Sequence, residues 1–220
     1  MSAPSGTTPA VSRAPGGLSL PRLERLADIV FASAFLLLLL SIDLAPEESE
    51  SALDAYKYLS TQVTQTLAFV INFLIIAYYW ISHQEYFGYY KCTNKVHIFI
   101  ELLFLMTIAG MPFNNHFIAA FPAEVAPRLA ISSDIFFAGI FTFLSWSYAT
   151  SGNRLVDENE MSPELVTFMR RQALIVPVFA VVGAGAAFLN PFAWDVILTI
   201  GPLFAMFFIK NAKNYDGATR

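Results

Sequence analysis

The feature that most constrains this chain is a series of long apolar segments, several with about the 20 residues that cross the hydrocarbon core of a bilayer. They run approximately over residues 20–44, 63–87, 96–120, 131–150, 173–189 and 192–209. A soluble domain of 220 residues has no core large enough to bury all of them. The pattern therefore predicts an all-α integral membrane protein, a six-helix bundle, and excludes a soluble globular domain.

Composition agrees with a membrane location. Hydrophobic residues make up 56% of the chain and charged residues 14%, whereas soluble domains carry about 25% charged residues. A single cysteine, Cys92, excludes an internal disulfide and argues against a thiolate metal cluster. The net charge of -4 gives no indication of a nucleic-acid partner.

Basic residues predict the orientation, because cytoplasmic loops are enriched in lysine and arginine. Eleven of the thirteen lie before or at the start of the first segment, after the sixth, or between the second and third or the fourth and fifth. Only Lys57 and Arg128 fall on the opposite side, where the first loop is acidic. We therefore expect both termini in the cytoplasm, with a flexible tail over residues 1–17, a six-helix transmembrane domain over 18–213 and a short tail over 214–220.

Aromatic residues gather near the ends of the segments. They are Tyr78, Tyr79, Trp146, Tyr148 and Trp194. Amphipathic rings are enriched at membrane–water interfaces, where the apolar body meets lipid and the polar atom meets water. The sequence therefore predicts that these five side chains form interfacial anchors.

An aspartate inside the first apolar run is the first candidate functional residue, because a charge within a membrane is costly. Asp28 needs a partner, and Arg25 lies three residues before it on the same helical face. Arg22 lies six residues before it, closer to the cytoplasm. The alternative is that both arginines are ordinary interfacial charges whose long side chains reach water.

A tryptophan and a histidine end the second segment, at the same predicted membrane depth as Asp28. Trp80 and His83 lie one helical turn apart. A histidine in this setting is more often a packing residue than a metal ligand, and the other two, His97 and His116, lie near opposite ends of the third segment. No metal site and no cofactor are therefore expected.

Three motifs together resemble the transmembrane protein 175 family, the relatives of the endolysosomal potassium channel. They are Arg22-x-x-x-Leu26-Ala27-Asp28 in the first segment, Trp80-x-x-His83-x-x-x-Phe87 in the second, and the run from Glu101 to Pro112-Phe113 in the third. The family reads Arg-x-x-x-Phe-Ser-Asp in its first helix, has a Trp and a His in its second, and ends its third-helix pattern in Pro-Phe. Departures are Leu26 and Ala27 in place of Phe and Ser, and Glu101 in place of the usual Asn.

The resemblance implies a bacterial plasma (inner) membrane channel, a homotetramer with a central pore lined by the first helix and permeable to potassium and other monovalent cations. It places the pore constriction at Ser33, Leu37 and Leu40, which follow Asp28 by five, nine and twelve residues. These spacings put the three on one helical face. Ser33 stands where an aliphatic residue is usual, which bears on ion selectivity.

The resemblance also implies a polar network that packs the helices at the cytoplasmic end of the pore. Its members are Arg22, Asp28, Trp80 and His83. Read without the resemblance, a leucine stripe at helical spacing is most often a lipid-facing or packing surface.

Two other functions stay open on the sequence. Asp28, His83 and Glu101 suit a proton relay in a proton-coupled secondary transporter. Against that reading, the chain shows neither internal repeats nor helix-breaking residues at corresponding positions of two halves. The second is a membrane subunit that does not conduct. An enzyme is not expected, because no nucleophile and base stand at useful spacing.

Overall fold

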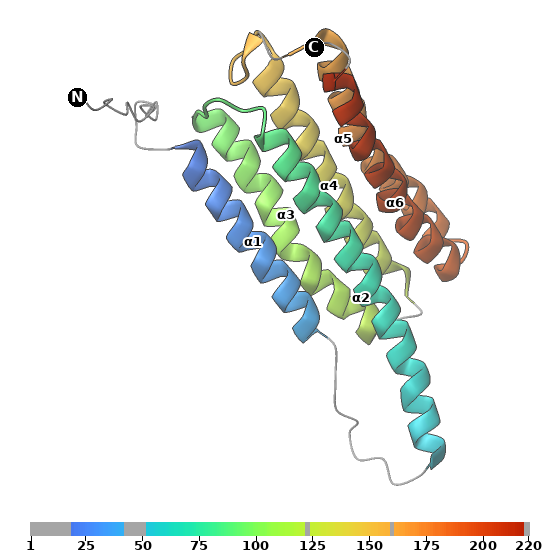
Figure 1. The fold of residues 1–220 in the computed structure, drawn as a ribbon. Helices are drawn as coiled ribbons and strands as arrows, with labels where there is room; N and C mark the ends of the chain where they lie inside the picture. Colours follow the sequence, from blue (N-terminus) through green and yellow to red (C-terminus); the bar gives the residue numbers. More distant parts are fainter. Residues whose placement is uncertain (1–18, 42–51, 122–123, 159–160, 218–220) are drawn as a thin grey trace, which may run out of the picture.

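The computed structural model describes residues 19–41, 52–121, 124–158 and 161–217. The expected tail over residues 1–17 lies outside this range. The helices are α1 (Leu20–Leu40), α2 (Ala52–Phe87), α3 (Lys95–Ala120), α4 (Val125–Thr150), α5 (Pro163–Ala187) and α6 (Pro191–Gly217). They form one bundle (Figure 1), in which α1 contacts α2 and α3, α4 contacts α3 and α5, and α6 contacts α5 and α2.

The first helix packs through one narrow stripe. Pro21 stands in its first turn, where a missing backbone N–H costs no intrahelical bond, and alanines and leucines continue the helix. Its buried side chains recur every three or four residues: Leu23, Ala27, Phe31, Ala34 and Leu38. The two alanines let backbones approach closely, as small residues do between membrane helices.

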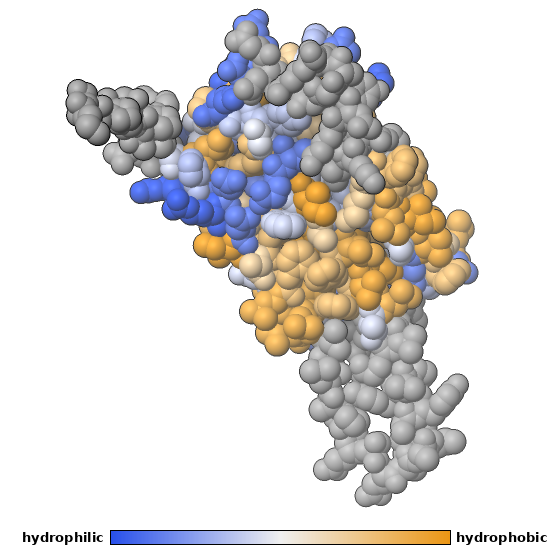
Figure 2. Space-filling model, in the orientation of Figure 1, coloured by the Kyte–Doolittle hydropathy of each residue, from blue (hydrophilic) through white to orange (hydrophobic). Residues whose placement is uncertain are grey.

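The helices are apolar enough to place the chain in a membrane. By length and composition, four described stretches can cross a bilayer: Thr66–Phe87, Lys95–Ile118, Val125–Thr150 and Pro163–Ala187. α6 adds a shorter apolar stretch, Pro191–Phe207, and α1 carries its charges in its first half. On the face seen in Figure 2, hydrophilic residues gather at the end of the bundle where α1 begins, and hydrophobic residues cover most of the surface beyond it. The chain is a multi-pass membrane protein.

Several helices extend past the predicted segments, because hydrophobicity marks only the apolar middle of a helix. α2 begins at Ala52, α4 at Val125 and α5 at Pro163, each earlier than the apolar run suggests. Capping stabilises such an added turn at the start of α5. The Ser162 side chain accepts a hydrogen bond from the Leu165 amide at 3.1 Å. α6 continues to Gly217, into the stretch predicted as a C-terminal tail.

Most of the aromatic residues predicted as interfacial anchors are buried between helices instead. Tyr79, on α2, donates to the carbonyl of Ile135 on α4 at 2.6 Å, and Trp146 donates to the carbonyl of Val166 on α5 at 3.1 Å. Trp194 is likewise only 1% exposed. Because each ring carries one donor that a neighbouring helix satisfies, the polar atom does not require water.

Candidate functional site

One side of α1 is left uncovered within the single chain. Leu37 is 52% exposed and Leu40 69%, and Ser33 is also exposed, so the three predicted constriction residues share this side. Leu36 and Ile29 are exposed as well. Exposure therefore makes the predicted residues available to a pore or to another chain, and does not by itself separate them from neighbouring leucines.

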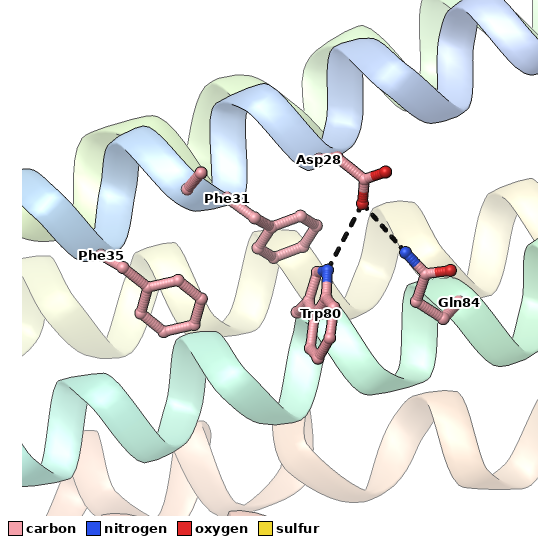
Figure 3. A pocket seen from close by; sticks show the side chains of 6 residues that line it. Asp28, Phe31, Phe35, Trp80 and Gln84 are labelled. Carbon is pink, nitrogen blue, oxygen red and sulfur yellow. Dashed lines mark hydrogen bonds between the residues drawn. The ribbon is translucent and has the colours of Figure 1, made fainter.

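Asp28 joins the first half of α1 to the last turns of α2. Its Oδ1 accepts a hydrogen bond from Gln84 Nε2 at 2.9 Å and a longer one from Trp80 Nε1 at 3.4 Å (Figure 3). The two donors are four residues apart, so both stand on one face of α2. The sequence singled out Trp80 but not Gln84. Asp28 itself is exposed in the single chain, and its partners are these α2 side chains.

A groove of about 560 Å³ opens beside this contact. Its lining consists of Asp28, Phe31, Ala32, Phe35, Trp80 and Gln84. In Figure 3 the rings of Phe31 and Phe35 project from α1 toward α2, beside the Asp28 carboxylate. The groove is thus apolar along most of its wall and carries one charge.

The other two members of the predicted network lie elsewhere. Arg22 is exposed, and no hydrogen bond or ion pair joins it to Asp28 in the described residues. His83 points into the bundle behind α1, where its ring packs edge-on against Phe31 with centroids 5.8 Å apart and stacks on Phe87 at 4.0 Å. The structure therefore brings Asp28 and Trp80 together and places Arg22 and His83 apart from them.

His83 instead belongs to a buried cluster around Glu101, which is 4% exposed. Its Nε2 lies 3.4 Å from one carboxylate oxygen of Glu101, and His97 Nε2 lies 3.5 Å from the other. Ser145, on α4, donates a short hydrogen bond to the same carboxylate. One acidic side chain thus connects α2, α3 and α4.

Hydroxyl groups extend the cluster toward the loop between α2 and α3. Thr93 Oγ1 lies 2.8 Å from His97 Nδ1, and the Tyr90 hydroxyl lies 3.2 Å from Ser145 Oγ. Burial, reinforced by the charge of Glu101, raises the pKa of Tyr90. The phenol therefore keeps its proton and stays a neutral hydrogen-bonding partner.

A spacing in the sequence indicates part of this cluster. His97 and Glu101 are four residues apart on α3, and a short connection joins the end of α2 to the start of α3. His97 was set aside because it lies on another segment, so this connection was not used. Across the described ranges, no group of three or more His, Cys, Asp or Glu side chains is arranged to hold a metal ion.

Replacing Asp28 with alanine is expected to loosen α1 from α2, because Gln84 and Trp80 lose their shared acceptor. The expected loss is about 1 kcal/mol of stability, a typical net value for such hydrogen bonds. The measurement is thermal unfolding of the purified protein in mild detergent. The control is Glu24→Ala on the same helix, since Glu24 has no hydrogen bond to a described residue. Equal unfolding temperatures for the two variants would contradict the packing role of Asp28.

Sequence relatives of the chain are potassium channels. The profile of the family described as endosomal/lysosomal potassium channel TMEM175 matches residues 22–112. A potassium channel of Streptomyces collinus is 31% identical over 103 residues, 47% of this chain and 49% of the relative, so the match spans about half of that relative. A potassium channel of Chamaesiphon minutus is 25% identical over 191 residues, 84% of this chain and 90% of the relative.

Solved structures share the fold. A crystal structure of a homologue of the lysosomal potassium-selective channel TMEM175 from Chamaesiphon minutus superposes with a TM-score of 0.69 and 20% identity, covering 88% of this chain and 97% of that one. A crystal structure of a variant of the potassium channel MtTMEM175, in complex with a nanobody–MBP fusion protein, superposes with a TM-score of 0.54 and 17% identity. That superposition covers 98% of this chain and 99% of the other. The chain therefore resembles the transmembrane protein 175 family in sequence over residues 22–112, and its six-helix fold is the one seen in the solved channel structures.

Proposed function

We propose that this protein is a potassium-permeable, leak-like cation channel of a bacterial plasma membrane, a homotetramer whose central pore is lined by α1. The observation that carries the proposal is the uncovered side of α1, which holds Ser33, Leu37 and Leu40. Two relatives named potassium channels support it, one of them matched over 84% of this chain.

The chemistry of the uncovered side changes along α1 in the way a narrowing pore requires. Arg22, Arg25 and Asp28 occupy its cytoplasmic half, and Leu37 and Leu40 its outer half. Charged side chains favour a water-filled entrance, whereas lipid disfavours them. Four copies of α1 arranged around an axis would place a hydrated vestibule before an apolar constriction.

The constriction acts through size and dewetting. Rings of Leu37 and Leu40 offer no oxygen to replace the water around a cation, so conduction depends on how wide the rings stand. A ring of Ser33 hydroxyls, one turn closer to the cytoplasm, supplies oxygens to a partly dehydrated ion. This arrangement passes monovalent cations without a filter of backbone carbonyls.

A proton-coupled secondary transporter is the second candidate, and one observation favours it. The contacts from Thr93 through His97 and Glu101 to His83 form a continuous series of polar side chains. The series reaches from the cytoplasmic loop to the back of α1 at Phe31. Such a series can carry a proton.

One flux assay separates the two functions. Purified protein is placed in liposomes loaded with potassium and diluted into sodium, with a pH-sensitive dye reporting proton entry. A channel lets potassium leave, but protons enter only after a protonophore is added, and sodium-loaded liposomes respond less. Dye quenching before the protonophore would establish exchange with protons and contradict the channel. Absence of flux from folded, tetrameric protein would contradict both functions.

A further inference from the structure

A series of three polar side chains ties the outer end of α1 to the two helices behind it. Asn115 Nδ2, on α3, donates to Ser41 Oγ at 3.1 Å, and Asn115 Oδ1 accepts from Asn72 Nδ2, on α2, at 2.8 Å. Asn72 and Asn115 are 1% and 4% exposed. Figure 1 shows this end of α1 beside the last turns of α3.

These amides stand where apolar side chains would otherwise fill the bundle. A buried amide without partners is costly in an apolar environment, so each asparagine depends on the contacts made by the other. Asn72 has one additional anchor, the carbonyl of Ala68 on its own helix, at 3.0 Å. Only one relative position of the three helices satisfies all of these hydrogen bonds. The bonds therefore specify how α1, α2 and α3 are aligned along their axes more than they add to stability.

Ser41 fixes the part of α1 that is otherwise least constrained. The last carbonyls of a helix have no intrahelical partner, so its final turn is the first to open. Here the Ser41 hydroxyl donates to the carbonyl of Leu38 at 2.7 Å, and the Ser41 amide bonds to the same carbonyl at 3.3 Å. Leu40 precedes Ser41 directly and Leu37 lies one turn earlier.

We propose that the series Ser41–Asn115–Asn72 positions the outer turn of α1 and thereby sets the width of the Leu37 and Leu40 constriction. Asn115 is the central positioning residue, because it alone bonds both of the others. It touches no ion and acts through Ser41. The inference rests on the proposed channel function for its effect on ions, and on the contacts alone for its effect on α1.

The neighbouring residue offers a matched control. Asn114 donates a short hydrogen bond to Asp134 on α4, so it makes an interhelical contact of the same chemistry. That contact links α3 to α4 and does not reach α1. A general weakening of α3 would appear in variants of both asparagines, whereas repositioning of α1 would appear only in variants of Asn115.

The first readout is amide hydrogen exchange in residues 36–41 of the full-length protein in detergent, which does not depend on conduction. Asn115→Leu and Ser41→Ala should accelerate exchange there about fivefold, the equivalent of about 1 kcal/mol for one hydrogen bond. Ser41→Thr, which keeps the hydroxyl, and Asn114→Leu should leave it at the wild-type rate. Unchanged exchange in Asn115→Leu, or equal acceleration in Asn114→Leu, would overturn the anchoring.

The second readout is the ratio of potassium to sodium flux in liposomes. Asn115→Leu and Ser41→Ala should change this ratio by a similar factor, about threefold or more, and the double variant should add little because both break one series. Ser41→Thr, which keeps the hydroxyl, should leave the ratio of potassium to sodium flux at the wild-type value. Altered exchange with an unchanged flux ratio would refute control of the constriction. A wild-type protein that passes no cation would refute the channel function, and hydrogen exchange would then still test the anchor.

Discussion

Glu101→Leu is expected to lower the stability of the protein by about 3 kcal/mol, through a change inside the bundle and remote from the uncovered side of α1. Leucine fills a similar volume, so the cost arises from lost polar partners and not from a cavity. Among the described residues, the Nε2 atoms of His83 and His97 make no hydrogen bond, so the Glu101 oxygens 3.4 and 3.5 Å away are their polar contacts. Ser145 also donates to this carboxylate. Buried polar groups left without partners cost about 1 to 3 kcal/mol each.

Thermal unfolding in mild detergent, followed by tryptophan fluorescence, measures this loss. The matched control is Glu101→Gln, which keeps an oxygen acceptor of nearly the same size and should lose much less. If Glu101→Leu unfolds at the wild-type temperature, the carboxylate does not hold α2, α3 and α4 together.

Leu37→Ala is expected to raise potassium flux about tenfold, which corresponds to a barrier lower by about 1.4 kcal/mol. In a tetramer the substitution removes four apolar side-chain ends from one ring, so the constriction widens and holds water more readily. Because Leu37 is 52% exposed in the single chain, its truncation should leave the packing of α1 intact.

The initial rate of potassium efflux from liposomes, corrected for the amount of protein inserted, measures the change. Val181→Ala on α5 removes two carbons, against three in Leu37→Ala, from an apolar side chain that is 57% exposed and distant from the proposed pore. Size-exclusion chromatography establishes that both variants keep the assembly of the wild type. Equal flux in the Leu37 and Val181 variants would place the constriction elsewhere.

The six helices were predictable because the thickness of a bilayer sets the length of the apolar run that each spanning helix needs. Their ends were less predictable, since polar turns beyond the apolar run depend on caps such as Ser162 and on packing. Arg128 illustrates the limit: its charge was assigned to an outside loop, but it lies within α4, 4% exposed, with its guanidinium over the Trp194 ring at 5.7 Å. Stacking and backbone contacts let the helix include a charge that hydrophobicity alone excludes.

Candidate site residues divide in a similar way. The approach of Asp28 to Trp80 follows from their equal membrane depth on adjacent helices. Gln84 carries no charge and stands at an unspecified position of the second-segment motif, so nothing in a single sequence marked it as a partner. His97 was overlooked because it lies on a different apolar segment from His83. The short loop between α2 and α3 nevertheless brings the start of α3 close to the end of α2. Contacts between helices depend on rotation about each axis, which spacing along one helix does not fix.

The most direct test of the central claim, that α1 lines a cation pathway, is block of flux by a cationic thiol reagent at single cysteines. The native thiol, exposed in the loop before α3, is first removed as Cys92→Ser. Ser33→Cys and Leu37→Cys should then become sensitive to the reagent, whereas Ala34→Cys, on the buried stripe, should not. Block that follows this helical periodicity is the predicted result. Flux through a conducting protein that the reagent leaves unchanged at both Ser33→Cys and Leu37→Cys would contradict the account.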